Sequence, residues 1–284
     1  MTIATSVPTT TSAAPVAAPP ARFRDVLAAE WIKMRSLRST PWTIALTTLF
    51  VIGSAVAAAV ADYNNLAGSH TSLRQPPDFL PFDAFPPSGY MTLMLVAGSM
   101  GAITVVSEYS SGLIRTTTVA VPARGTVVLA KAVVTAGVWT VVGTVVSIGS
   151  FLVSQAILDG RHAGVSITHP GVFRGLAASA LLAPVCALVG LGLGVLIRHS
   201  AATMVTSAFT LLMLPTLFEQ SKRWSADVNH AMLITVWRRL VQNWQPDPTS
   251  RMYTATVTGS WIVYAVWPLA AVVLAVVVVR RRDV

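Results

Sequence analysis

Six apolar runs alternate with polar connectors along the 284-residue chain. A helix rises about 1.5 Å per residue, so about 20 mostly apolar residues cross about 30 Å of hydrocarbon. The pattern therefore predicts an all-α integral membrane fold, with six transmembrane helices in one domain over residues 22–284. The expected spans are residues 43–61, 89–106, 126–158, 172–197, 201–218 and 257–279. Because the third run is longer than a bilayer requires, we expect its first turns to project beyond the membrane.

The N-terminal part of the chain precedes the first apolar run. Residues 1–21 are rich in Thr, Ala and Pro and carry no charged side chain, which predicts a disordered tail. An amphipathic interfacial helix is expected next, since large apolar residues then recur at helical spacing. The stripe consists of Phe23, Val26, Leu27, Trp31 and Met34, whereas Arg24, Asp25, Lys33 and Arg35 point elsewhere.

Glu30 interrupts this apolar stripe. At about 100° per residue, its side chain falls near the middle of the apolar face. A covered carboxylate requires a cationic partner, whereas a carboxylate at a thin and wet interface requires none. The pattern leaves both interpretations open.

The largest connector, residues 219–256, contains a second amphipathic pattern. Its apolar residues fall on one helical face and its polar residues on the other, which predicts an outer helix pressed on, or dipping into, the outer leaflet. The apolar face consists of Met232, Leu233, Val236, Trp237, Leu240, Val241 and Trp244. The pattern does not decide between an interfacial and a re-entrant helix.

The composition agrees with a membrane protein. Hydrophobic residues make up 54% of the chain and charged residues 11%, and the mean hydropathy is +0.65. Soluble domains carry about 25% charged residues, so this chain has too little polar surface to be one. The single cysteine, Cys186, lies in an apolar run and supports neither an intrachain disulfide nor a cysteine-based metal site.

The net charge of +9 is distributed unevenly over the connectors. With six spans both termini lie on one side, which holds twelve of the 20 Lys and Arg but four of the 11 Asp and Glu. The positive-inside rule therefore places both termini, and the connector after the second span, in the cytoplasm. Because orientation and lipid head groups account for the charge, and no basic helix alternates with aromatics, we expect the bilayer as a partner and no nucleic acid.

The connector from Glu108 to Lys131 is polar and basic. Gly112 and Pro122 punctuate it, which predicts a short cytoplasmic helix between spans 2 and 3. The pattern alone is equally consistent with an ordinary cytoplasmic loop. The run from Gly125 to Lys131 has a superficial likeness to a phosphate-binding loop, but it lacks the second Gly and the Mg²⁺-binding hydroxyl. We therefore expect no ATP hydrolysis, no enzyme activity and no cofactor in this chain.

The spans contain few residues that could catalyse a reaction or bind a metal or another ion. All five histidines lie in connectors, so no catalytic or metal-binding pair is expected at membrane depth. Ionisable residues are confined to the ends of the spans, and no internal repeat is evident. Because ion-coupled carriers keep an ion site near the midplane, a secondary transporter is disfavoured.

Several short stretches resemble type-2 ABC exporter permeases. In the connector they are Glu108-x3-Gly112, Ile114-Arg115-Thr116-Thr117, Pro122 and Ala130-Lys131, where the family usually has Gly-Lys in the last. Residues 30–36 are similar to the interfacial connecting helix of that family. The resemblance implies a coupling helix that docks on a separate ATPase. It implies coupling roles for Glu30, Glu108, Gly112, Arg115, Pro122 and Lys131.

The resemblance also implies an assembly and a location. Two copies of this chain, or this chain and a similar one, would sit on two ATPase subunits that hold ATP and Mg²⁺. The protein would lie in a bacterial plasma membrane, and its use of Ala, Val and Arg is typical of a GC-rich bacterium such as an actinobacterium. The alternative function is that of a non-transporting membrane sensor or scaffold. An ion-coupled secondary carrier is a third, less favoured alternative.

The expected cargo path follows spans 2 and 5, which line the central cavity in the family resembled. Both spans mix adaptable apolar side chains with small polar ones, as suits an amphipathic drug, peptide antibiotic or lipid. The path residues are Met94, Met100, Thr206, Phe209, Thr210 and Met213. The same mixture of side chains is also found where a helix only packs against other helices or contacts lipid.

Overall fold

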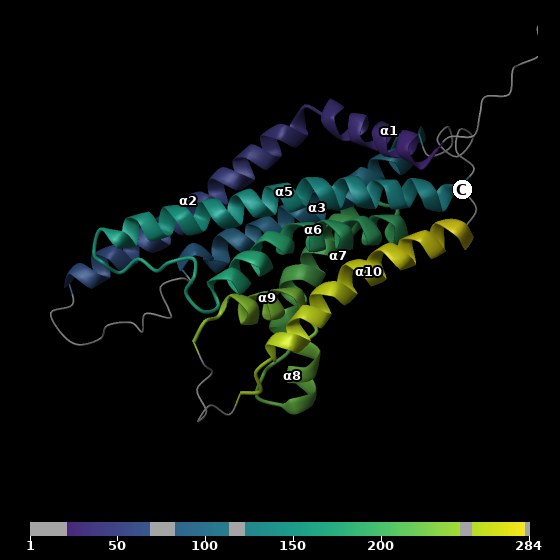
Figure 1. Ribbon diagram of the computed structural model, residues 1–284. Coiled ribbons are helices and arrows are strands. Elements are labelled where there is room, and N and C mark those ends of the chain that lie inside the picture. The colour runs from purple at the N-terminus through teal and green to yellow at the C-terminus, as the bar shows by residue number, and fades with distance from the viewer. Residues whose placement is uncertain (1–21, 69–82, 114–122, 245–251, 282–284) are drawn as a thin grey trace, which may run out of the picture.

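The computed structural model describes residues 22–68, 83–113, 123–244 and 252–281, and within these ranges the regular structure is helical (Figure 1). Helix α1 (Phe23–Ser36) comes first, and two short helices, α8 (Arg223–Asn229) and α9 (Leu233–Val241), precede the last long one. The long helices are α2 (Ser39–Gly68), α3 (Pro87–Ser110), α5 (Arg124–Asp159), α6 (Val172–Ile197) and α10 (Val257–Arg281). With the segment Ser200–Leu217 they make six segments long and apolar enough to span a membrane. The prediction of an all-helical fold with six candidate spans is therefore confirmed.

The helices are generally longer than the apolar runs that predicted them. The fourth span coincides with residues 172–197, but α2 exceeds the predicted 43–61 at both ends. Hydropathy marks the part of a helix that suits lipid, whereas its backbone hydrogen bonds continue into flanking polar residues. The 36 residues of α5 rise about 54 Å, which leaves room for the projection expected at its start.

Helix α6 lies at the centre of the bundle, and small residues let its neighbours approach closely. A Cβ added at Gly190 would lie 1.8 Å from the carbonyl oxygen of Gly98 in α3, and one added at Gly101 would lie 1.9 Å from that of Ala187. Gly194 also faces α3, at Ala102. Gly190 and Gly194, four residues apart, thus lie on the face of α6 that contacts α3 closely.

The fifth span is not one regular helix. Helix α7 (Ser200–Ala208) passes into a π turn, Phe209–Met213, and then a 3-10 turn, Leu214–Leu217. The segment coincides with the predicted span over 201–218, but its backbone is irregular after Ala208. Pro215 explains the change, because it has no N–H to donate to the carbonyl four residues earlier and its ring crowds that carbonyl.

The amphipathic helix of the last large connector is confirmed as α9, but its environment differs from the prediction. Its apolar face is buried in protein rather than turned toward lipid: Trp237 is fully covered and stacks on Tyr90 of α3 with 5.0 Å between ring centroids. Trp237 Nε1 also donates a hydrogen bond of 3.2 Å to Ser179 Oγ of α6. An apolar stripe fits a protein core as well as a leaflet, so the pattern could not separate the two. Helix α8 has no counterpart in the prediction.

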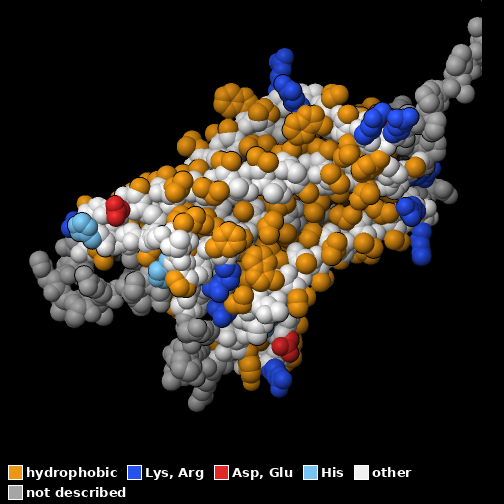
Figure 2. All heavy atoms as spheres, viewed as in Figure 1, with side chains coloured by type: hydrophobic (Ala, Val, Ile, Leu, Met, Phe, Trp, Pro, Cys, Tyr) orange, Lys and Arg blue, Asp and Glu red, His pale blue; other side chains and the backbone are white. Residues whose placement is uncertain are grey.

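The outer surface of the bundle is itself apolar. Figure 2 shows hydrophobic side chains over most of the face in view, with several Lys and Arg toward the end where α10 finishes. Trp42, Leu49 and Phe173 each expose 70% or more of their surface. Exposed apolar area of this extent is what lipid covers in a multi-pass membrane protein.

Candidate functional site

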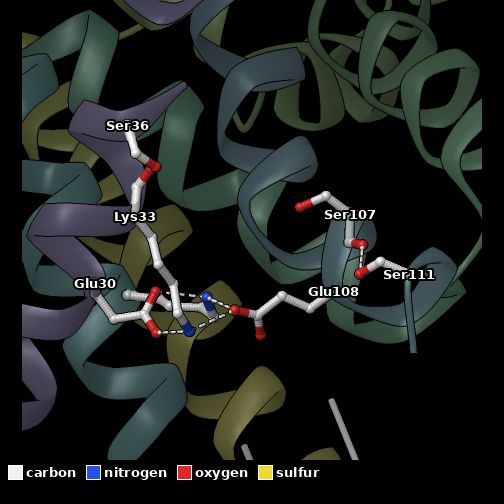
Figure 3. Close-up of polar contacts among 7 residues, drawn as sticks. Glu30, Lys33, Ser36, Ser107, Glu108 and Ser111 are labelled. Carbon is white, nitrogen blue, oxygen red and sulfur yellow. Dashed lines mark hydrogen bonds and ion pairs between the residues drawn. The ribbon is translucent and has the colours of Figure 1, made fainter. Parts of the chain in front are cut away.

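Four charged side chains from three helices meet at one end of the bundle (Figure 3). We call Glu30 and Lys33 of α1, Glu108 of α3 and Lys131 of α5 the ion cluster. Lys131 Nζ lies 2.7 Å from Glu108 Oε1 and 2.5 Å from Glu30 Oε2. Lys33 Nζ lies 2.8 Å from Glu30 Oε1 and 2.8 Å from Glu108 Oε1. Each ammonium group therefore bridges both carboxylates.

Local structure brings these groups together. Glu30 and Lys33 are three residues apart, so they lie side by side on α1. Val26 and Leu27 of the same helix pack on Val127 and Ala130 of α5, which holds α1 against the start of that helix. Because α3 ends at Ser110 and α5 begins at Arg124, the ion cluster ties α1 to both sides of the connector between spans 2 and 3.

The ion cluster is largely removed from water. Glu30, Glu108 and Lys131 expose 6%, 5% and 5% of their surface, whereas the Lys33 side chain exposes 43%. The four charges sum to zero, and such pairing is what makes buried charges tolerable. Burial tends to lower the pKa of Lys33, but its hydrogen bonds and charge pairing with Glu108 and Glu30 outweigh burial and raise that pKa.

The structure brings together three of the residues to which the resemblance gave coupling roles. Glu30, Glu108 and Lys131 meet in the ion cluster. Of the two interpretations left open for Glu30, the structure supports the covered carboxylate with cationic partners. Gly112 follows the end of α3 with a φ of +72°, the left-handed conformation in which glycine often ends a helix. Arg115 and Pro122 lie outside the described residues.

Lys33 was missed as a member of the site. The helical stripe indicated that it points away from the apolar face, and its side chain reaches back to Glu30 and Glu108. The signal available in the sequence was its spacing of three from Glu30, which places the two on neighbouring positions of a helix.

The six path residues do not line one surface of the single chain. Met94 is fully buried in the core, while Phe209 and Met213 expose 46% and 58% of their surface. Met100 lines a cleft beside α1, α2 and α5. Thr206 and Thr210 are partly buried along the fifth span. Three of the six, Phe209, Thr210 and Met213, fall within the π turn.

A second pair of acids lies at the opposite end of α2 and was not singled out by the sequence. Asp83 exposes 8% of its surface and lies beside Asp62 of α2. Burial, together with the hydrogen bond and charge of Asp62, raises the pKa of Asp83 to about 8. Over the described residues, no group of three or more His, Cys, Asp or Glu could hold a metal ion.

The fold and surface define a class: an all-helical, multi-pass membrane protein with six candidate spans. No protein-family model matches the chain, and no curated protein matches it. The resemblance of the chain to type-2 ABC permeases therefore rests on the short stretches quoted above.

Proposed function

We propose that the chain is the membrane subunit of an ATP-driven exporter of the type-2 ABC class. The observation that carries the proposal is the ion cluster, which joins α1 to the facing ends of α3 and α5. A partner that binds the connector between those helices would move all three together. A separate ATPase subunit needs such a linkage to transmit its movement to the membrane helices.

The position of charge supports an external energy source. The ion cluster is neutral overall and lies at the ends of its helices, in contrast to the midplane site of an ion-coupled carrier. On this proposal two ATPase subunits hold ATP and Mg²⁺, and two copies of this chain, or this chain and a similar one, form the membrane part. Both termini and the ion cluster then face the cytoplasm of a bacterium.

The proposed cargo is an amphipathic compound that leaves along spans 2 and 5. Phe209 and Met213 supply exposed apolar surface on the fifth span, within a π turn, a form of helix frequent at functional sites. A flexible thioether and an aromatic ring on an irregular backbone suit cargo of varied shape.

Reconstitution with an ATPase tests the proposal. The chain would be co-purified with the ATPase encoded beside it, placed in vesicles, and assayed for ATP hydrolysis and for movement of amphipathic dyes. We expect ATP-dependent transport. A stable complex without transport would indicate a sensor or scaffold, and transport driven by a proton gradient without ATP would indicate a secondary carrier.

The ion cluster gives the matched variants for this assay. In Glu108→Ala, α3 loses its link to α1 and α5, so cargo-stimulated ATP hydrolysis should fall at least about tenfold while the complex still assembles. Ser110→Ala, at the exposed end of the same helix, should match the wild type. Equal transport by Glu108→Ala and wild type would contradict the role of the ion cluster.

The cargo path has its own test. Phe209→Ala and Met213→Ala should change which compounds stimulate hydrolysis and leave basal hydrolysis intact, because neither side chain contacts the ion cluster. Leu217→Ala removes a similarly exposed side chain beyond the π turn and serves as the control. An unchanged compound profile in both path variants would place the path elsewhere.

A further inference from the structure

A pocket of about 240 Å³ lies between α3, the irregular end of the fifth span, α9 and the residues before α10. We call it the arginine pocket, because two neighbouring arginines of α9, Arg238 and Arg239, line it. Its other walls are neutral and include Met91, Leu212, Gln220, Ile234, Thr235 and Gln242. Figure 2 shows Lys and Arg side chains at the position that α9 has in Figure 1, apart from those where α10 finishes.

The arginine pocket lies far from the ion cluster, where three spans reach the opposite end of the bundle. Met91 is in the second turn of α3, and 17 residues, or about 25 Å of helix, separate it from Glu108. Gln220 follows the end of the fifth span, and Ala255 precedes the start of α10. At this depth a ligand can come from the water or from the layer of lipid head groups.

Positive charge in the arginine pocket is not balanced by acid. Among the described residues that line it, none is Asp or Glu. Arg174 of α6 brings a third guanidinium to its edge, where it donates hydrogen bonds of 2.9 Å and 2.6 Å to the carbonyl oxygens of Leu240 and Gln242. Because a hollow lined by one sign of charge concentrates ions of the other sign, the arginine pocket favours an anion.

The two lining arginines keep hydrogen-bond donors for a ligand. Arg239 Nε donates to the carbonyl oxygen of Ala255 at 2.8 Å, which holds the side chain in the pocket wall and leaves its terminal nitrogens to other partners. Arg238 is exposed, and its guanidinium makes no hydrogen bond or ion pair within the described residues. One guanidinium fork satisfies a carboxylate, whereas a phosphate has enough oxygens and charge to accept from two forks at once.

Neutral side chains of the same pocket supply acceptors. Asn229 Oδ1 accepts hydrogen bonds from Thr235 Oγ1 at 2.8 Å and from Gln220 Nε2 at 3.2 Å. Both donors are thereby committed to Asn229, so Thr235 Oγ1 and Gln220 Oε1 are left to accept. Hydroxyl groups on the ligand would meet this requirement.

We propose that the arginine pocket binds a polyol phosphate, with the phosphate held between Arg238 and Arg239 and the hydroxyl groups donating to Thr235 and Gln220. A glycerol phosphate has this chemistry, whether it is free in water or forms the head group of a lipid. The site does not depend on the proposed export activity, because binding is a property of the chain alone.

Protection from an arginine reagent tests the proposal on the unmodified chain. The full chain in dodecyl maltoside would be treated with phenylglyoxal, and the modification of each arginine followed by mass spectrometry. Saturating glycerol 3-phosphate should slow modification of Arg238 at least about fivefold. Arg223 is the internal control and should react as before, because it is exposed and lines a different pocket together with Asp227.

Two further ligands share the glycerol skeleton and define the anion. Glycerate carries a carboxylate in place of the phosphate and should need an about tenfold higher concentration for the same protection, and glycerol should give none. Equal protection by glycerol, equal slowing of Arg223, or no protection by glycerol 3-phosphate would overturn the proposal.

A pair of variants locates the site. Arg238→Gln removes a guanidinium that holds no described part of the chain, so the fold should persist, and half-protection of Arg239 should need about tenfold more glycerol 3-phosphate. Lys222→Gln removes the same charge at an exposed position outside the arginine pocket and should leave the protection unchanged. If Arg238→Gln and Lys222→Gln behave alike, the ligand is not held by the arginine pocket.

Short-chain lipids distinguish the two sources of the phosphate. Stronger protection by dihexanoylphosphatidylglycerol than by glycerol 3-phosphate would support the proposal with a lipid head group as ligand, and the reverse order would support it with a soluble phosphate. Dihexanoylglycerol has the same tails without phosphate. If it protects as well as dihexanoylphosphatidylglycerol, the tails bind and the proposal is wrong.

Discussion

At the scale of single residues, burial distinguishes the two lysines of the ion cluster. Lys131 and Lys33 contact the same two carboxylates at similar distances, but the Lys131 side chain exposes 6% of its surface and the Lys33 side chain 43%. Removing one partner of a buried pair leaves an uncompensated charge, which costs far more than removing a partner that water can replace. The two lysines therefore provide a matched comparison.

Lys131→Met should lower the free energy of unfolding by about 2–4 kcal/mol, because it leaves two buried carboxylates to share one ammonium. Lys33→Met makes the same chemical change at a half-exposed position and should cost less than about 1 kcal/mol. Denaturant titration of the detergent-solubilised chain, followed by tryptophan fluorescence, measures both. Similar losses in the two variants would show that burial does not set the strength of the ion cluster.

Asp83 predicts a dependence of stability on pH. Its pKa is about 8 in the fold, against about 3.9 for an unfolded aspartate. Between these values the folded chain holds a proton that the unfolded chain has lost, so stability should fall as the pH rises from about 4 to about 8. Above about pH 8 the contribution should change no further.

Melting of the chain at about pH 5 and about pH 8 measures this effect. Asp83→Asn should flatten the decrease over this range, because the amide does not titrate. Asp159→Asn changes an exposed aspartate at the end of α5 and should keep the wild-type decrease. If Asp83→Asn also keeps it, another group is responsible.

At the scale of helices, close contact depends on a few glycines. Gly101 faces the backbone of Ala187, where a methyl group would lie 1.9 Å from the carbonyl oxygen, whereas Gly137 of α5 has nothing within 4 Å of an added Cβ. Backbone cannot move aside as a flexible side chain can. The substitution of glycine by alanine should therefore have opposite effects at the two positions.

Gly101→Ala should separate α3 from α6 and lower the free energy of unfolding by about 1–3 kcal/mol. Gly137→Ala should be neutral or stabilising by up to about 1 kcal/mol, since alanine is the better helix former. Chemical unfolding of both variants under the same conditions provides the comparison. A stable Gly101→Ala chain would mean that the two helices can shift apart without loss.

Apolar patterning predicted the long helices well, since each must turn apolar residues to lipid or to protein along most of its length. It failed where a contact between distant residues decided the structure. Trp237 was placed on an apolar face correctly, but only the fold reveals that Tyr90 and Ser179 cover it. The π turn depends on how Pro215 is accommodated, which periodicity does not encode.

The candidate site shows the same limit. Glu30, Glu108 and Lys131 stood out by their place on a stripe or in a motif. Their pairing could not be predicted, because Lys33 and Glu108 are 75 residues apart in the sequence and Glu30 and Lys131 are 101 residues apart. Asp83 stayed unnoticed because its environment depends on Asp62, on another helix. Sequence pattern thus identified charged residues that needed an explanation, and tertiary packing supplied it.

At the scale of the whole molecule, the ion cluster lies at the same end of the bundle as the start of α1 and the end of α10 (Figure 1). Gly125 at the start of α5 lies against Arg280 at the end of α10, which draws the first turns of α5 and the last turn of α10 together. The turn after α5, at Asp159–Gly171, lies at the other end. The positive-inside rule predicts that the end with the ion cluster faces the cytoplasm.

Two exposed serines at opposite ends test this orientation. In a Cys186→Ala background, Ser111→Cys beside the ion cluster should resist a membrane-impermeant thiol reagent in intact cells and react after the cells are opened. Ser166→Cys, in the turn that follows α5, should react in intact cells. The reverse pattern would put the ion cluster outside the cell, out of reach of any cytoplasmic ATPase, and would remove the basis of the proposed export function.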